Sequence, residues 1–146
     1  MPVIAIGLFL LAMLLNHAID NQTDAAITTE ADQSRVVAEQ MIMVRNSASS
    51  YAESHRSTNA GVSLGQLDLD SSIVLDPCIE AYIAAGKAYA YCSSGPNGLH
   101  GELVEQTDRS FFVGVNSNGL LRNAATGTTN VTIPKAVPDG AVVYVQ

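Results

Sequence analysis

The chain opens with a continuous apolar stretch. Its first fifteen residues carry no charged side chain, and the run from Val3 to Ile19 is interrupted only by Asn16 and His17. As a helix it would reach roughly 25 Å, about the lower limit for crossing a bilayer, and backbone in lipid must satisfy its own hydrogen bonds. The pattern predicts a transmembrane signal anchor over residues 1–20, its apolar surface formed by Val3, Ile4, Ile6, Leu8, Phe9, Leu10, Leu11, Leu14 and Leu15.

A cleaved signal peptide is the main alternative to a retained anchor. Cleavage needs a basic leading region and a small-x-small site after the apolar run. This chain begins with only its α-amino group, and Asn16-His17-Ala18 has the wrong residue at the first small position. A buried core helix is a further alternative, but polar residues would then be expected within the run, and none precedes Asn16. The sequence therefore favours retention of the apolar segment as an uncleaved anchor.

The flanks of the apolar run indicate its orientation. Asp20, Asp24, Glu30 and Asp32 all precede the first arginine, Arg35. Basic residues prefer the cytoplasmic side of a membrane, whereas acidic residues contribute little to orientation. We expect a short N-terminus inside and residues from about 20 onward exported.

A second periodic pattern begins in the thirties. Apolar residues recur with spacings of 4, 3, 4 and 3, which is typical of a helix buried along one face; they are Val37, Met41, Val44, Ala48 and Tyr51. Polar residues occupy the other side: Arg35, Glu39, Gln40, Asn46 and Glu53. The spacing predicts a helix over 34–55 after a juxtamembrane segment, residues 21–33. The stripe is either the core face of the domain or a packing seam for a partner helix.

The remainder predicts a small antiparallel sheet and one short helix. Residues 62–75 lack a period and indicate an irregular connection with room for one short strand. A short helix is predicted over 76–86, because Asp76 can cap its start, Pro77 suits the first helical position and Gly86 suits the exit. Strand patterns follow at 87–92, 110–115, 120–122, 130–133 and 141–145, with Asn118-Gly119 suited to a tight hairpin turn; residues 99–109 stay ambiguous between helix and strand.

The predicted fold class is therefore α+β, with an N-terminal anchor helix, a long amphipathic helix, a short helix and about four strands. The chain has 146 residues, so about 125 remain after the anchor, enough for one exported domain over 34–146. The net charge is −7 with only seven lysines and arginines, which argues against binding nucleic acid. Proteins are the expected partners, and oligomerisation is left open.

Cys78 and Cys92 are the two cysteines of the chain. In an exported domain a pair is more often joined than free, although inert thiols are the alternative. A ring of 15 residues is associated with about 3 kcal/mol in the chain-entropy model. We expect a disulfide that ties the first turn of the predicted short helix to the end of the strand over 87–92.

Catalytic motifs are missing from the sequence. It contains no H-E-x-x-H, G-x-S-x-G, P-loop or dinucleotide fingerprint. The three histidines have no second metal ligand or general base at a spacing that would indicate a metal or catalytic site; they are His17, His55 and His100. Asp68 and Asp70 suggest calcium, but the oxygen-rich loop that such a site needs is absent, so solvated carboxylates are expected. The sequence predicts no enzyme, no catalytic residue, no metal site and no cofactor.

Three segments carry a resemblance to a known family. Asn16-His17-Ala18-Ile19-Asp20, the segment from Arg45 to His55 and the tail from Asp139 to Val145 resemble the small PilM proteins of plasmid-encoded thin (type IVb) pilus systems. The resemblance implies a non-enzymatic component of a pilus assembly apparatus used in conjugation. It further implies a single-pass inner-membrane protein with a periplasmic C-terminal domain that contacts other pilus assembly proteins.

Two alternatives accompany this resemblance. A minor pilin incorporated in the fibre would share the long stem, but the fifth residue after Gly7 is Ala12 where pilins carry Glu, and no basic leader precedes it. A small exported hydrolase or inhibitor would require a processed N-terminus.

Overall fold

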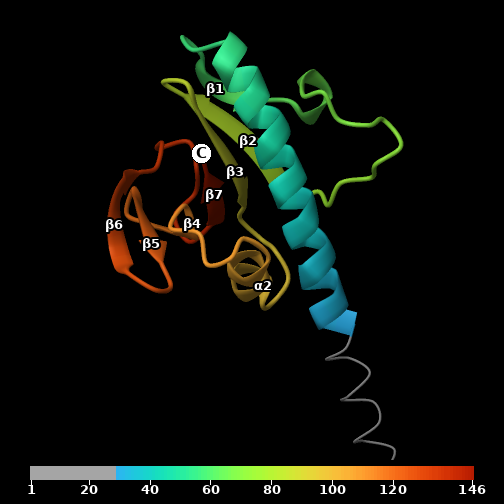
Figure 1. Ribbon diagram of the computed structural model, residues 1–146, viewed down its shortest axis with the longest axis vertical. Coiled ribbons are helices and arrows are strands. Elements are labelled where there is room, and N and C mark those ends of the chain that lie inside the picture. Colours follow the sequence, from blue (N-terminus) through green and yellow to red (C-terminus); the bar gives the residue numbers. More distant parts are fainter. Residues whose placement is uncertain (1–28) are drawn as a thin grey trace, which may run out of the picture.

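The computed structural model describes residues 29–146 (Figure 1). The predicted anchor over 1–20 and the juxtamembrane segment up to residue 28 lie outside the described residues, as do all nine apolar anchor positions. Over residues 29–146, no helix combines the length and apolar character that a bilayer crossing requires.

A long helix occupies residues 29–54 of the described chain. It already includes residue 29, so it begins before the predicted start at 34. Residues 29–33 are exposed, and burial begins at Ser34. Val37, Met41, Val44 and Ala48 are at most 1% exposed, and Tyr51 is half-buried. The predicted stripe therefore forms the core face of the domain.

A single antiparallel sheet packs against this helix. Its seven strands lie in the order β1-β2-β3-β7-β4-β5-β6. Their bounds are β1 Asn59–Val62, β2 Ile79–Ala84, β3 Lys87–Cys92, β4 Val113–Ser117, β5 Leu120–Asn123, β6 Gly127–Thr132 and β7 Val142–Val145. The C-terminal strand β7 pairs with both β3 and β4. The last residues of the chain therefore join the two halves of the sheet.

The predicted short helix over 76–86 is wrong, because most of this segment is strand β2. Ile79, Ala81 and Ile83 are buried and alternate with more exposed neighbours, which is the period of a strand. The presumed cap and exit residues have other roles. Asp76 accepts a hydrogen bond from the Cys78 N–H at 2.9 Å, and Gly86 (φ 75°) helps to form the tight turn into β3. Pairing with β1 and β3 decides the conformation here.

Other local predictions agree with the structure. Asn118 (φ 54°) and Gly119 (φ 80°) form the predicted turn between β4 and β5. Strands β6 and β7 match the predicted segments near 130–133 and 141–145. The ambiguous region becomes the helix α2, Leu99–Gln106. The irregular connection contains a short 3-10 helix, Leu64–Gln66, whereas strand β1 lies almost wholly before it and reaches only its first residue, Val62. The sheet is larger than the predicted four strands.

The sheet has a core on each face. On one face the long helix and α2 pack over the central strands, with Met41, Ile83, Leu103 and Val113 fully buried (Figure 1). On the other face Tyr89, Tyr91, Val143 and Val145 pack with Leu121 and with Ile133, Val137 and Ala141 of the connection between β6 and β7. The two cores hold the long helix and the loops at fixed positions on the sheet.

Candidate protein interface

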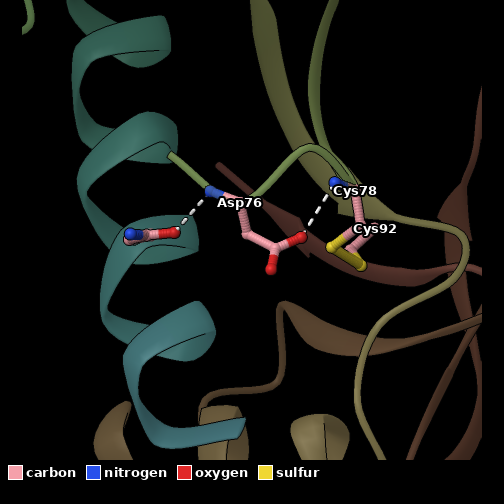
Figure 2. Close-up of a disulfide and its surroundings, with 4 residues drawn as sticks. Asp76, Cys78 and Cys92 are labelled. Carbon is pink, nitrogen blue, oxygen red and sulfur yellow. Dashed lines mark hydrogen bonds between the residues drawn. A yellow bond between two sulfur atoms is a disulfide. The ribbon is translucent and has the colours of Figure 1, made fainter. Parts of the chain in front are cut away.

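A clamp from the long helix shapes the loop that precedes β2. The Gln40 side-chain amide donates a hydrogen bond to the Val74 carbonyl at 3.0 Å, and its carbonyl oxygen accepts one from the Asp76 N–H at 2.8 Å. Asp76 in turn accepts from the Cys78 N–H (Figure 2). This chain of bonds fixes residues 74–78 beside the helix.

The Cys78–Cys92 disulfide anchors the same loop (Figure 2). Its two Cα atoms are 4.9 Å apart, and Cys92 lies opposite Ile79 in the register of β2 and β3. The predicted pair is therefore joined, but the disulfide links the start of β2 to the end of β3 and not the first turn of a helix.

An apolar groove lies between the helix and the clamped loop. It has a volume of about 440 Å³ and is lined by Val36, Val37, Val74, Leu75 and Pro77 together with Asp32, Gln33, Gln40 and Asp76. The Val74 side chain is 87% exposed and Val36 is 47% exposed. Among the described lining residues two are acidic and none is basic. We call this feature the helix groove.

The groove continues onto an outward stripe of the long helix. Asp32, Val36, Glu39 and Met43 follow one another at spacings of 4, 3 and 4, opposite the buried face. Val36 and Met43 are 47% and 37% exposed. The prediction of a polar outer side leaves out Val36 and Met43, although their spacing of seven residues is visible in the sequence. Contiguous exposed apolar surface marks a contact site, and Val36 and Val74 both line the helix groove.

A second exposed apolar feature follows α2. Phe111 and Phe112 are 63% and 46% exposed, and we call residues 108–112 the aromatic loop. Asp108 (φ 50°) and Arg109 (φ 60°) adopt the left-handed region, which costs energy for residues other than glycine. The strand predicted over 110–115 begins only at Val113, so Phe111 and Phe112 lie in the loop before β4, and nothing in the sequence pattern indicated them as a contact site.

Four hydrogen bonds fix the backbone of the aromatic loop and of the residue that follows it. Buried Asn123 donates hydrogen bonds to the carbonyls of Ser110 at 3.0 Å and Val113 at 2.8 Å. The Ser110 hydroxyl accepts from the Phe112 N–H at 3.3 Å, and the Phe112 carbonyl accepts from the Val145 N–H at 2.9 Å. The two phenylalanines are therefore presented by a backbone that is fixed before any partner binds.

A polar cavity of about 500 Å³ lies where α2 meets β4 and β5. Asn116 and Asn123 line it, but their side chains bond to backbone groups and serve the fold. His100 also lines it; burial lowers the pKa of its imidazole, and the Nε2 atom is buried without a hydrogen-bond partner. The remaining walls include Arg122 and Asp139, which carry opposite charges.

The candidate metal residues do not come together in the structure. Asp70 accepts a hydrogen bond from the Ser72 N–H at 2.9 Å, which lowers the pKa of its carboxyl. Over residues 29–146, no group of three or more His, Cys, Asp or Glu side chains is arranged to hold a metal ion. Asp70 thus forms a local turn in an exposed loop.

Comparisons with known proteins agree with this architecture. A family model described as PilM matches residues 8–145. The crystal structure of a PilM protein from Escherichia coli B7A is similar over 80% of this chain and 93% of that chain, with 20% identity and a TM-score of 0.59. One from Pseudomonas aeruginosa 2192 is 27% identical over 78% of this chain and 95% of that chain, with a TM-score of 0.51. A comparison with curated proteins gave no match.

Proposed function

The chain belongs to the PilM family of pilus-related proteins, and from this premise we propose that it is a component of a type IVb (thin) pilus assembly apparatus. In this proposal it is not an enzyme and acts through protein contacts in the periplasm, with other pilus assembly proteins as its partners. The single observation that carries a role in protein contact is the helix groove, because Val74 and Val36 expose apolar surface on a fixed framework.

The proposal includes an inner-membrane anchor formed by residues 1–20. The apolar sequence from Val3 to Leu15 supports this anchor. The disulfide supports a periplasmic location for the rest of the chain, because such bonds persist in oxidising compartments. The net charge of −7 supports protein partners over nucleic acid.

Genetic complementation tests the proposed role. Loss of the protein is expected to abolish assembly of thin pili and conjugation that depends on them, and the wild-type chain restores both. Val36→Asp combined with Val74→Asp places charges in the groove and is expected to fail to restore pili while the protein remains abundant. Thr128→Asp with Asn130→Asp, on the exposed edge strand β6, is the matched control and restores them.

Normal pilus assembly in cells that lack the protein would overturn this function. Membrane fractionation tests the anchor separately: the full chain is expected to sediment with inner membranes and to require detergent for release. Recovery in the soluble fraction without detergent would refute the anchor.

A minor pilin is the second candidate, favoured by the shape of the helix. The helix is continuous from at least residue 29, and residues 29–33 are exposed before the first buried position, so it extends as a stem. N-terminal sequencing of the membrane protein separates the candidates. A start at Met1 or Pro2 favours the anchored assembly factor, whereas a start near Leu8 and recovery of the protein in purified fibres favour a pilin.

A further inference from the structure

We propose that the polar cavity between α2, β4 and β5 binds a short peptide of about three residues, with its terminal carboxylate at Arg122 and its terminal ammonium at Asp139. This inference goes beyond the proposed function and does not depend on the helix groove. Its basis is a pair of opposite charges that line one cavity without forming an ion pair with each other.

The cavity has the size and the lining of a ligand site. Its volume of about 500 Å³ lies within the roughly 300–1,000 Å³ that is typical of such sites. Its walls combine the apolar side chains of Val115 and Ala124 with the polar groups of Ser117, Arg122 and Asp139. Ligand sites commonly have apolar walls and a few polar groups that fix the orientation of the ligand.

Both charged groups are available to a ligand. Within residues 29–146, the Arg122 guanidinium makes no hydrogen bond and no ion pair. Asp139 accepts a hydrogen bond from the Asn118 N–H through Oδ1 at 2.6 Å, and its Oδ2 atom has no partner in the described part of the chain. A ligand that carries both charges can therefore form a charge-assisted hydrogen bond at each end, and such bonds are stronger than those between neutral groups.

The register of the sheet sets the separation of the two charged positions. Arg122 lies opposite Val115 in the pairing of β4 and β5. Asn118, which bonds to Asp139, follows Val115 by three residues. Roughly 10 Å of strand therefore separates the two positions. A tripeptide in extended conformation spans about 10 Å as well, which sets the length of the proposed ligand.

Buried asparagines fix the walls of the cavity before a ligand binds. Asn116 donates hydrogen bonds to the carbonyls of residues 137 and 138, both at 3.0 Å, and so holds the chain that leads to Asp139. Asn123 accepts hydrogen bonds from the N–H groups of residues 125 and 126 at 2.8 and 3.2 Å. Both asparagines are at most 4% exposed. A site that is already fixed loses less conformational entropy when it binds its ligand.

His100, in the first turn of α2, completes the charge balance of the cavity. Burial lowers the pKa of its imidazole, so the ring is neutral at pH 7. Among the described lining residues, Arg122 and Asp139 then carry the charges, and the walls have no net charge. This balance favours a zwitterion over a ligand that carries a single charge.

NMR titration of the isotope-labelled, full-length chain in mild detergent tests the site. The probe is trialanine, which has a free ammonium and a free carboxylate at its two ends. We expect saturable shifts at millimolar concentrations, largest for the backbone amides of Ser117, Arg122, Ala124 and Gly127. The absence of saturable shifts, or shifts centred on other parts of the chain, would overturn the proposal.

Shorter and blocked peptides test the two charges and the length. N-acetyl-trialanine lacks the ammonium, trialanine amide lacks the carboxylate, and free alanine is too short to reach both charged positions. Each is expected to bind about tenfold more weakly than trialanine, because one charge-assisted contact is lost. Equal affinity of trialanine and the two blocked peptides would show that the cavity does not recognise a zwitterion, and equal affinity of free alanine would refute the proposed length.

Substitutions of the protein assign each contact. Arg122→Gln and Asp139→Asn are each expected to weaken trialanine binding by about tenfold. Asparagine keeps an Oδ1 acceptor for the Asn118 N–H, so the turn is retained. Lys87→Gln and Glu53→Gln remove the same charges at exposed positions outside the cavity and should leave binding unchanged.

The two variants should also lose different discriminations. Arg122→Gln is expected to bind trialanine and its amide equally, whereas Asp139→Asn is expected to bind trialanine and its N-acetyl form equally. Dispersed amide signals in both variants would show that the fold is retained. If both folded variants bind trialanine as the wild type does, the assignment of this cavity is wrong.

Discussion

The side-chain carbonyl oxygen of Gln40 accepts a hydrogen bond from the backbone N–H of Asp76 at 2.8 Å, across 36 residues of sequence. This bond attaches the loop before β2 to the long helix, and the attached loop forms one wall of the helix groove. The same glutamine bonds to the Val74 carbonyl, so a single side chain fixes the exposed Val74 in place.

Gln40→Ala is expected to lower the free energy of unfolding by about 1–2 kcal/mol, because two hydrogen bonds are lost and the Asp76 N–H is partly buried. Urea denaturation followed by circular dichroism measures the change. Gln33→Ala is the control, since Gln33 is an exposed glutamine on the same helix. Equal stability of both variants would show that the clamp contributes nothing.

Removal of the disulfide by Cys78→Ala with Cys92→Ala is expected to cost about 3 kcal/mol, because a closed ring of this length restricts the unfolded chain. Urea denaturation of both proteins without reductant gives the difference. Ser93→Ala with Ser94→Ala, in the exposed turn after β3, controls for local substitution. Thiol labelling of the unfolded, unreduced wild type should detect no free sulfhydryl, and detection of two would contradict the bond.

Gly114→Ala is expected to destabilise the sheet by about 1–3 kcal/mol. A Cβ at this position would overlap the carbonyl carbon and oxygen of Arg122 in the neighbouring strand β5. Gly101→Ala is the matched control: a Cβ there meets no atom within 4 Å, and alanine favours the helical backbone of α2. Thermal unfolding should show a lower midpoint for the first variant only.

His100 is expected to make the free energy of unfolding depend on pH below about 6.5. Burial lowers the pKa of its imidazole in the folded state below the ordinary value of 6.5, so the unfolded chain binds the proton more readily. The contribution of His100 to the free energy of unfolding is therefore complete above the pKa that the imidazole has in the unfolded chain. This contribution declines as the pH falls through 6.5. Urea denaturation between pH 8 and 5 should show a steeper loss for the wild type than for His100→Gln. Identical slopes for the two proteins would refute the effect.

The features that were predicted correctly have local causes. The spacing of Val37, Met41, Val44 and Ala48 requires only that one helix face be buried, and Asn118-Gly119 favours a tight turn whatever surrounds it. The segment over 76–86 was predicted wrongly because its capping residues suit a helix, whereas the alternation of Ile79, Ala81 and Ile83 suits a strand. Neighbouring strands on both sides supply the hydrogen bonds that decided between them.

By itself the sequence determined the α+β class, the buried stripe of the long helix, the β4–β5 hairpin and the likeness to PilM proteins. Tertiary structure alone decided that β7 lies between β3 and β4, that Gln40 holds the loop before β2, and that Phe111 and Phe112 face outward. The physical reason is range: periodicity and turn chemistry act over a few neighbouring residues, whereas strand order and exposure depend on contacts between segments far apart in the chain.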